Sequence, residues 1–189
     1  NLAVGAEYRK ETWEAGPGDE WSRYFEGGQS FPGISLSDAG DHDRDNIAAY
    51  VDVSMEPVEN LRVGLAGRYE DYSDFGDTTN PKVAVRWAPI ETLAFRASWG
   101  TGFRAPSLHQ QFFTTTSTNF IGGVPYDIKT FPATSGAAAA LGARPLEPEK
   151  SINISAGVTA EPTANLSLTA DYYGIAIDDR IVFSANVTT

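Results

Sequence analysis

Three short stretches contain residues that could do chemistry. The first, GTGFRA (Gly100–Ala105), fits the G-x-G-x-x-A pattern of dinucleotide-binding turns. In such turns the pyrophosphate rests on the N-terminus of a helix that follows the glycines. Here Pro106 follows at once, and no amphipathic helical pattern comes next. We therefore reject a nucleotide site and expect Gly100 and Gly102 to let the backbone bend where a strand leaves its sheet.

The second stretch, DHDRD (41–45), resembles the start of a calcium-binding loop. The central glycine of such a loop is replaced by Asn46, and a strand pattern follows instead of a helix. The favoured interpretation is a solvated acidic loop, and no metal site is assigned. If calcium bound here, the oxygen ligands would come from Asp38, Asp41, Asp43 and Asp45.

Catalytic groups are scarce. His42 and His109 are the only histidines, and cysteine is absent. The third stretch is the acidic pair Glu147 and Glu149, which flanks Pro148 and so indicates a turn rather than the two carboxylates of a glycosidase. No nucleophile is paired with a base. We predict that the protein is not an enzyme and needs no cofactor, and the sequence does not specify which residues bind a ligand.

The composition excludes further classes of protein. The 189 residues carry a formal net charge of −11, which argues against a nucleic-acid partner because such partners require Lys and Arg. There is no apolar run of about 18 residues, so no membrane-spanning helix is expected. A barrel that is apolar outside and polar inside would still average to near-neutral hydropathy.

One local pattern occurs three times: Pro, three residues, then Leu, followed by alternation. Pro fixes φ and lacks an N–H, so each copy predicts a tight turn between two strands. These turns are expected at about 57–60, 89–92 and 162–165.

Period-two alternation of apolar and polar residues flanks these turns. It predicts seven strands and an all-β, antiparallel meander. A short helix is allowed at Ser135–Leu141. The expected strands are Leu2–Arg9, Ile47–Glu56, Leu61–Glu70, Lys82–Trp87, Leu93–Trp99, Ser151–Thr159 and Leu166–Tyr172.

The connections alternate between short and long. The long ones cover about 14–44, about eight residues at Ser73–Asn80, and about 103–149. In a meander, this places all short turns at one end and all long loops at the other, as in transmembrane β-barrels. The apolar faces also end in aromatic residues, which favour a membrane interface: Tyr8, Tyr69, Trp99 and Tyr172. A soluble carbohydrate-binding β-sandwich is the alternative, and it would bury these apolar faces under a second sheet.

Three segments, taken in order, resemble the barrel region of TonB-dependent receptors of the Gram-negative outer membrane. They are Arg68–Phe112 with its GFRAPSL motif, Leu146–Val158 with LEPEKS, and Leu168–Ile181 with LTADYYGIAIDDRI. The resemblance covers more than half of the chain. It implies that residues 1–189 are an internal section of a larger barrel, with the long loops outside and the short turns in the periplasm.

The family resemblance also implies a function. Such receptors take up a scarce large ligand: an iron siderophore, haem, cobalamin or an oligosaccharide. Energy reaches them from the TonB complex, which binds a TonB box on an N-terminal plug domain. The sequence shows no match to the plug, to the TonB-binding segment or to the C-terminal aromatic residue of such barrels. Aromatic residues in the long loops, such as Trp21, Phe31, Phe112 and Tyr126, could stack on a ligand or pack the loops.

Overall fold

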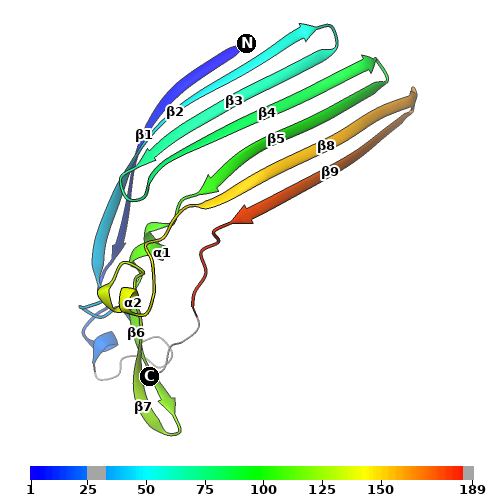
Figure 1. Cartoon of the computed structure of the whole chain (residues 1–189). Helices are drawn as coiled ribbons and strands as arrows, with labels where there is room; N and C mark the ends of the chain where they lie inside the picture. Colours follow the sequence, from blue (N-terminus) through cyan, green and yellow to red (C-terminus); the bar gives the residue numbers. More distant parts are fainter. Residues whose placement is uncertain (25–32, 185–189) are drawn as a thin grey trace. The chain divides into compact units, whose positions relative to one another are not determined.

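The computed structural model describes residues 1–24 and 33–184, and it is mainly β-strand. Two one-turn α-helices and a 3₁₀ turn interrupt the strands (Figure 1). The elements are β1 (Leu2–Ala15), η1 (Trp21–Arg23), β2 (Gly40–Val58), β3 (Leu61–Tyr72), β4 (Gly76–Ile90), β5 (Leu93–Arg104), α1 (Leu108–Phe112), β6 (Thr115–Ile121), β7 (Val124–Thr130), α2 (Gly136–Ala140), β8 (Glu149–Thr163) and β9 (Leu166–Asp178).

Seven strands form one sheet in the order β1-β2-β3-β4-β5-β8-β9. From β2 to β9 every neighbouring pair is antiparallel. The predicted seven-stranded meander is thus confirmed, as is the short helix, which forms as α2 with Ser135 as its N-cap. The hairpin of β6 and β7 is a separate two-stranded sheet that the alternation did not predict.

The chain divides into two compact units, which are described separately. Unit 1 holds most of the large sheet and comprises Asn1–Arg9, Asp45–Ala105 and Pro148–Thr189. Unit 2 comprises Lys10–Arg44 and Pro106–Glu147 and contains the long connections with α1, α2 and the β6–β7 hairpin.

The three predicted hairpins form, but the prolines lie differently from the prediction. Each two-residue turn follows the proline, and the proline itself falls within a register shift of the preceding strand, between Met55 and Val58, Trp87 and Ile90, and Ala160 and Thr163. A β-bulge leaves one residue outside the ladder, so a proline without an N–H costs no hydrogen bond there. The shared spacing therefore encodes a bulge followed by a turn.

The predicted eight-residue connection at Ser73–Asn80 is wrong. Strand β3 ends at Tyr72 and β4 begins at Gly76, so only residues 73–75 connect them. The ladder between these strands continues to Tyr72 and Gly76 without a register shift. Polar residues such as Asp77, Thr78 and Thr79 prevented the prediction of this extension. A strand end with polar side chains on both faces shows no alternation of hydrophobicity.

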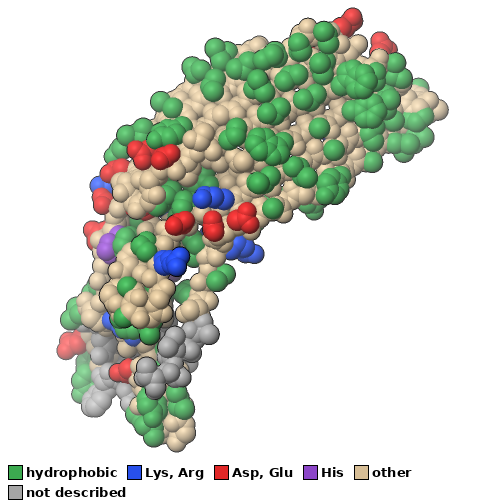
Figure 2. Space-filling view, viewed as in Figure 1, with side chains coloured by type: hydrophobic (Ala, Val, Ile, Leu, Met, Phe, Trp, Pro, Cys, Tyr) green, Lys and Arg blue, Asp and Glu red, His purple; other side chains and the backbone are tan. Residues whose placement is uncertain are grey.

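One face of the unit 1 sheet is apolar and uncovered. Val51, Leu65, Phe95 and Ile154, one from each of four strands, keep 43%, 42%, 41% and 44% of their surface exposed. Figure 2 shows hydrophobic side chains spread over these strands. In the part of the chain that the structure describes, no second sheet packs on this face, so a β-sandwich is not favoured. None of the helices among the described residues is long and apolar enough to cross a membrane.

Few side chains of the described residues are buried, and they include about as many polar as apolar ones. The buried apolar side chains include Ala15, Ala48, Tyr72, Leu108 and Ala138, and the buried polar ones are Asp38, Arg44, Asn46, Glu70, Gln111 and Glu149. A single sheet with an uncovered apolar face has no hydrophobic core of its own. Hydrogen-bond ladders and polar contacts therefore hold unit 1 together.

Candidate functional site

One row of charged residues crosses the strands on the polar face of the unit 1 sheet. Arg62 of β3 lies opposite Arg86 of β4, and Arg86 lies opposite Arg96 of β5. The row continues through Gly157 of β8 to Asp171 of β9. Like charges directly opposite one another on neighbouring strands are destabilising. Three adjacent arginines therefore require compensation.

The two outer arginines have carboxylate partners. Arg62 donates from Nε and Nη2 to Glu56 Oε1, at 3.0 and 2.6 Å. Arg96 donates to Asp171 Oδ1 from Nε at 2.8 Å and from Nη2 at 2.7 Å, across the intervening strand β8. Gly157 makes this crossing possible, because a Cβ there would overlap the Asp171 carboxylate and lie 2.8 Å from Arg96 Nε.

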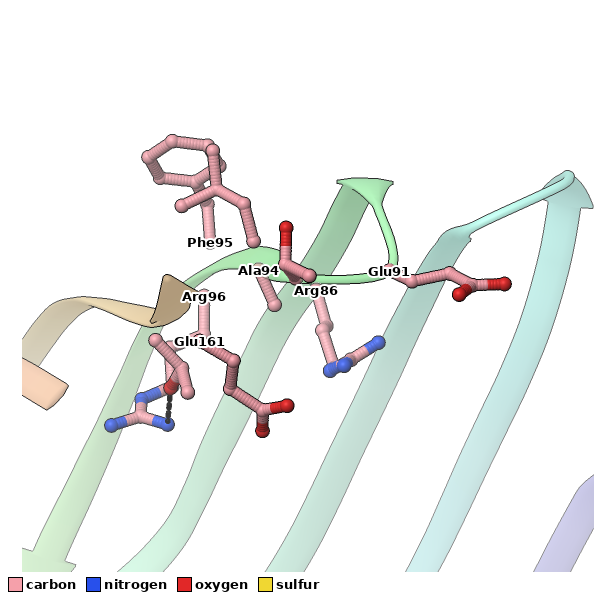
Figure 3. Close-up of a pocket in the computed structure, with 9 residues that line it drawn as sticks. Arg86, Glu91, Ala94, Phe95, Arg96 and Glu161 are labelled. Carbon is pink, nitrogen blue, oxygen red and sulfur yellow. Dashed lines mark hydrogen bonds between the residues drawn. The ribbon is translucent and has the colours of Figure 1, made fainter. Parts of the chain in front are cut away.

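The central arginine has no such partner. Among the described residues, no hydrogen bond or ion pair joins Arg86 to a carboxylate. Arg86 and Arg96 line a pocket of about 240 Å³ beside the β4–β5 turn, together with Glu91 and Glu161. In Figure 3 the two arginine side chains and Glu161 extend from one side of the sheet, and Phe95 extends from the other.

A second polar network joins β1 and β3 on the same face. Arg68 donates to Glu70 Oε1 at 2.7 Å and to Glu7 Oε2 at 3.1 Å. Tyr72 donates to Glu70 Oε2 at 3.2 Å and accepts from Arg9 at 3.0 Å. Because Glu70 and Tyr72 are buried, this network fixes the polar wall rather than offering free groups to a ligand.

Arg104, at the end of β5, forms a bidentate pair with Glu149 of β8, with Nε–Oε2 and Nη2–Oε1 distances of 2.9 and 2.6 Å. Glu149 also accepts the Ile181 N–H at 2.9 Å. The fork geometry of a guanidinium matches the two oxygens of a carboxylate. This pair holds β5 and β8 together where both leave the sheet.

In unit 2 a buried carboxylate forms contacts with several segments of the chain. Asp38 is 3% exposed and pairs with Lys129 of β7 at 2.9 Å. It also accepts hydrogen bonds from Ser35, Thr114 and Thr116. Burial opposes ionisation of Asp38, but the hydrogen bonds and the charge of Lys129 outweigh it, so its pKa lies below the ordinary value.

Two of the other three conditional calcium ligands also have partners. Asp43 pairs with Lys10, and Asp45 accepts from Tyr8 at 2.6 Å. Within residues 1–24 and 33–184 no group of three or more His, Cys, Asp or Glu side chains could hold a metal ion. The acidic stretch therefore ties strands and loops together through separate contacts.

Both histidines lie in an aromatic cluster of unit 2, although His42 was expected in a loop and lies in β2. His42 stacks on Phe112, with ring centroids 3.7 Å apart and planes 10° apart, and more distantly on Trp13 at 6.0 Å. His109 contacts the edge of Trp13 at 5.9 Å and also Phe113. A capping box formed by Ser107 and Gln110 starts α1 and so positions these rings.

The GTGFRA stretch is part of β5 as far as Arg104, so its glycines do not precede a phosphate-binding helix. A Cβ at Gly100 would lie 3.3 Å from Lys82 and the Pro81 carbonyl, and one at Gly102 would lie 3.0 Å from Ser151 Oγ. Glycine at these two positions allows the close approach of neighbouring strands.

The loop aromatics fall into two groups. Phe112 and Phe113 belong to the cluster around the histidines, whereas exposed rings lie on η1 and on the β6–β7 hairpin. Phe25 and Phe31 lie outside the described residues. The exposed rings are Trp21, Tyr24, Phe120, Tyr126 and Phe131.

Comparison with known proteins places this geometry in a family. The family model described as "TonB dependent receptor-like, beta-barrel" matches residues 1–189. A curated relative, the vitamin B12 transporter BtuB of Vibrio cholerae, is 31% identical over 97 residues, which are 50% of this chain and 15% of the relative.

Solved structures show the same fold. The siderophore receptor PirA from Acinetobacter baumannii superposes with a TM-score of 0.69 at 15% identity, over 100% of this chain and 26% of the receptor. A variant of the ferric enterobactin receptor PfeA from Pseudomonas aeruginosa gives a TM-score of 0.67 at 17% identity, over 93% of this chain and 24% of the receptor. The chain thus spans about a quarter of these structures and less of the curated relative.

Proposed function

This chain belongs to the TonB-dependent receptor-like β-barrel family, and from that premise we propose that it forms part of the wall and outer loops of an uptake receptor. Barrels of this family lie in the outer membrane of Gram-negative bacteria, and this chain lies there too. One structural feature carries the proposal: a single antiparallel sheet whose apolar face is uncovered and whose opposite face carries arginine–carboxylate pairs. Such a sheet suits lipid on one side and a wet interior on the other.

The names of the relatives support a proposal for the class of ligand. One relative is a vitamin B12 transporter, and the solved neighbours are siderophore and ferric enterobactin receptors. We infer a scarce ligand too large for diffusion through a pore, such as a metal chelate, and uptake energised through TonB rather than any enzymatic reaction. The exposed rings of the long connections, at about 14–44 and 103–149, are the surfaces that a flat chelate could stack on.

Uptake by intact cells tests this proposal. Radiolabelled ferric siderophores, haem, cobalamin and oligosaccharides are given to three kinds of cell. These are cells with the full-length gene, cells without it, and TonB-deficient cells. The expected result is uptake of one class that requires both the gene and TonB. Uptake that continues without TonB, or an outer-membrane protein that supports no uptake from the panel, would contradict the proposal.

Sidedness needs its own experiment. Epitopes inserted at 122–123, in the β6–β7 hairpin, and at 164–165, in the β8–β9 turn, report which end faces the medium. We expect antibody labelling of intact cells only for the first insertion. Antibody labelling of the insertion at 164–165 on intact cells would show that the orientation is the reverse of the one proposed.

A further inference from the structure

Asp38 is a buried carboxylate that joins two separate connections of unit 2. It lies in the connection between β1 and β2, in a turn closed by two N–H groups that donate to the Ser35 carbonyl at 3.1 and 3.0 Å. From the connection between β5 and β8, Thr114 donates to Oδ1 at 3.1 Å and Thr116 to Oδ2 at 3.2 Å. The ammonium group of Lys129 lies 2.9 Å from Oδ1. Both carboxylate oxygens therefore bind the β6–β7 hairpin or the residue that precedes it.

On the side of the β1–β2 connection, further contacts relate the turn of Asp38 to η1. The Gly18 N–H donates to the Ile34 carbonyl at 3.1 Å, which brings the two ends of this connection together. Ser22 of η1 packs at the same place, because its Oγ occupies the space that a Cβ at Gly18 would fill. The exposed ring of Trp21 in η1 therefore has a set position relative to the turn that carries Asp38.

On the side of the hairpin, the same carboxylate sets the position of two exposed rings. Thr116 and Lys129 lie opposite each other in the register of the hairpin, so both reach Asp38 from one face. Phe120 lies on that face four residues beyond Thr116, which is about 14 Å along the strand. The Lys129 ammonium also lies 5.9 Å from the centroid of the Phe131 ring.

Fixing these rings before a ligand binds has a physical consequence. Rings in two separate connections would each lose conformational freedom on binding one chelate. Contacts that form on folding remove this cost from the binding step, so a pre-organised surface binds more tightly. The contacts of Asp38 are suited to this role, because loss of one partner from a buried ion pair is strongly destabilising.

We propose that Asp38 is a positioning residue for ligand capture. It holds the β6–β7 hairpin to the β1–β2 connection, so that the exposed rings of the two elements keep fixed relative positions before a ligand arrives. This inference rests on the proposed function, which assigns these rings to the binding of a flat chelate. It adds that folding builds the binding surface, and that the two connections do not assemble around the chelate independently.

Distances between two spin labels in the full-length receptor test this proposal without any ligand. Cysteines are placed at Glu20, next to η1, and at Asn119 of β6, both exposed, and any cysteine outside residues 1–189 is replaced. We expect a narrow distribution of distances in the parent protein and its loss in Asp38→Ala. Asp127→Asn is the matched control, because this carboxylate lies on the same hairpin and bonds to Thr118. A broad distribution in the parent protein, or one equally narrow in Asp38→Ala, would overturn the proposal.

The concentration dependence of uptake separates positioning from folding. The probes are radiolabelled vitamin B12 and ferric enterobactin, the compounds named for the relatives. Asp38→Ala should raise the half-saturating concentration about tenfold, while the maximal rate per receptor stays unchanged. Asp127→Asn should change neither quantity. A lower maximal rate with an unchanged half-saturating concentration would show that Asp38 serves folding alone, and the proposal would be wrong.

The remaining outcomes are separable. Heat-modifiable gel mobility establishes that the barrel of each variant has folded. If Asp38→Ala does not fold, Thr116→Val replaces it, because it removes a single hydrogen bond and should broaden the distances in the same direction. If no compound is taken up, the proposed function fails and the spin-label distances alone decide this inference. If uptake requires TonB but the distances do not change in the folded variants, only this inference fails.

Discussion

At the scale of single residues, the polar face depends on a glycine that makes room for its neighbours. Arg96 reaches Asp171 across β8 only because Gly157 has no Cβ. The charge row is thus continuous across five strands, and its outermost acid lies two strands away from the arginine it neutralises.

Gly157→Ala should therefore destabilise the folded barrel, although alanine is usually no worse than glycine in a strand. The added methyl overlaps the Asp171 carboxylate, so the exposed pair of Arg96 and Asp171 must shift or break. Gly64→Ala is the matched control on the same face, because its Cβ would meet Ala84 at an ordinary 3.9 Å. Urea unfolding of the full-length protein in detergent measures both, and equal midpoints would refute the role given to Gly157.

Asp38 makes the stability of unit 2 depend on pH in the acidic range. Its pKa is depressed in the folded state, so it binds fewer protons than in the unfolded chain. The contribution of Asp38 to the free energy of unfolding is complete above the pKa of an aspartate in the unfolded chain, about 3.9. It is lost as the pH falls through the lower pKa that Asp38 has in the folded state.

We predict that the amide NMR signals of Thr116 and Lys129 move together below about pH 4 as Asp38 takes up its proton. Asp38→Asn should abolish that titration, while Asp127→Asn, an exposed carboxylate on the same hairpin, should leave it unchanged. Titration that persists in Asp38→Asn would show that another acid controls the hairpin.

At the scale of elements, the three sheet turns share a spacing but not a backbone conformation. Asn60, in the β2–β3 turn, has φ of 65°, a left-handed value that asparagine tolerates and β-branched residues avoid. Thr92 holds the same position in the β4–β5 turn and is not among the described residues with positive φ.

Asn60→Val should therefore cost about 1–2 kcal/mol of folding free energy. Thr92→Val should change it by less than about 0.5 kcal/mol, as most surface substitutions do. The same urea titration compares the two variants with the parent protein. Equal losses in both would mean that the turn conformation does not limit stability.

Much of this element structure follows from the sequence, for a physical reason. Strands that face lipid on one side and water on the other must alternate, so all seven could be predicted. The β6–β7 hairpin could not, because Thr115–Thr118 is polar at every position and gives no period-two signal. Its turn at Gly122 and Gly123, both with positive φ, was the available clue.

The candidate site was harder to predict than the strands. Arg62, Arg86 and Arg96 could be placed on one face, but their alignment in one row depends on register, which the bulges at the prolines set. The signal that could have revealed how Arg96 reaches across β8 is Gly157, a glycine on a polar face that otherwise carries Ser, Asn and Thr. Apart from Ser35, the partners of Asp38 lie on or beside the distant β6–β7 hairpin, and no local pattern encodes them.

At the scale of the whole molecule, the account depends on the orientation of the sheet between lipid and water. The apolar and polar faces are both exposed in this chain, so their environments in the receptor differ only if a membrane lies against one of them. Burial of the apolar face in a membrane is what makes a sheet without a hydrophobic core stable.

The most direct test is the accessibility of spin labels along β8 in the full-length receptor in lipid bilayers. These 189 residues contain no cysteine, so single cysteines can be placed at successive positions from 151 to 157. We predict that labels at Ile152, Ile154 and Ala156 collide mainly with oxygen dissolved in lipid, and those at Asn153 and Ser155 mainly with a water-soluble nickel complex. Equal accessibility to both reagents along the strand, or the opposite alternation, would contradict the assignment of this chain to a lipid-facing barrel wall.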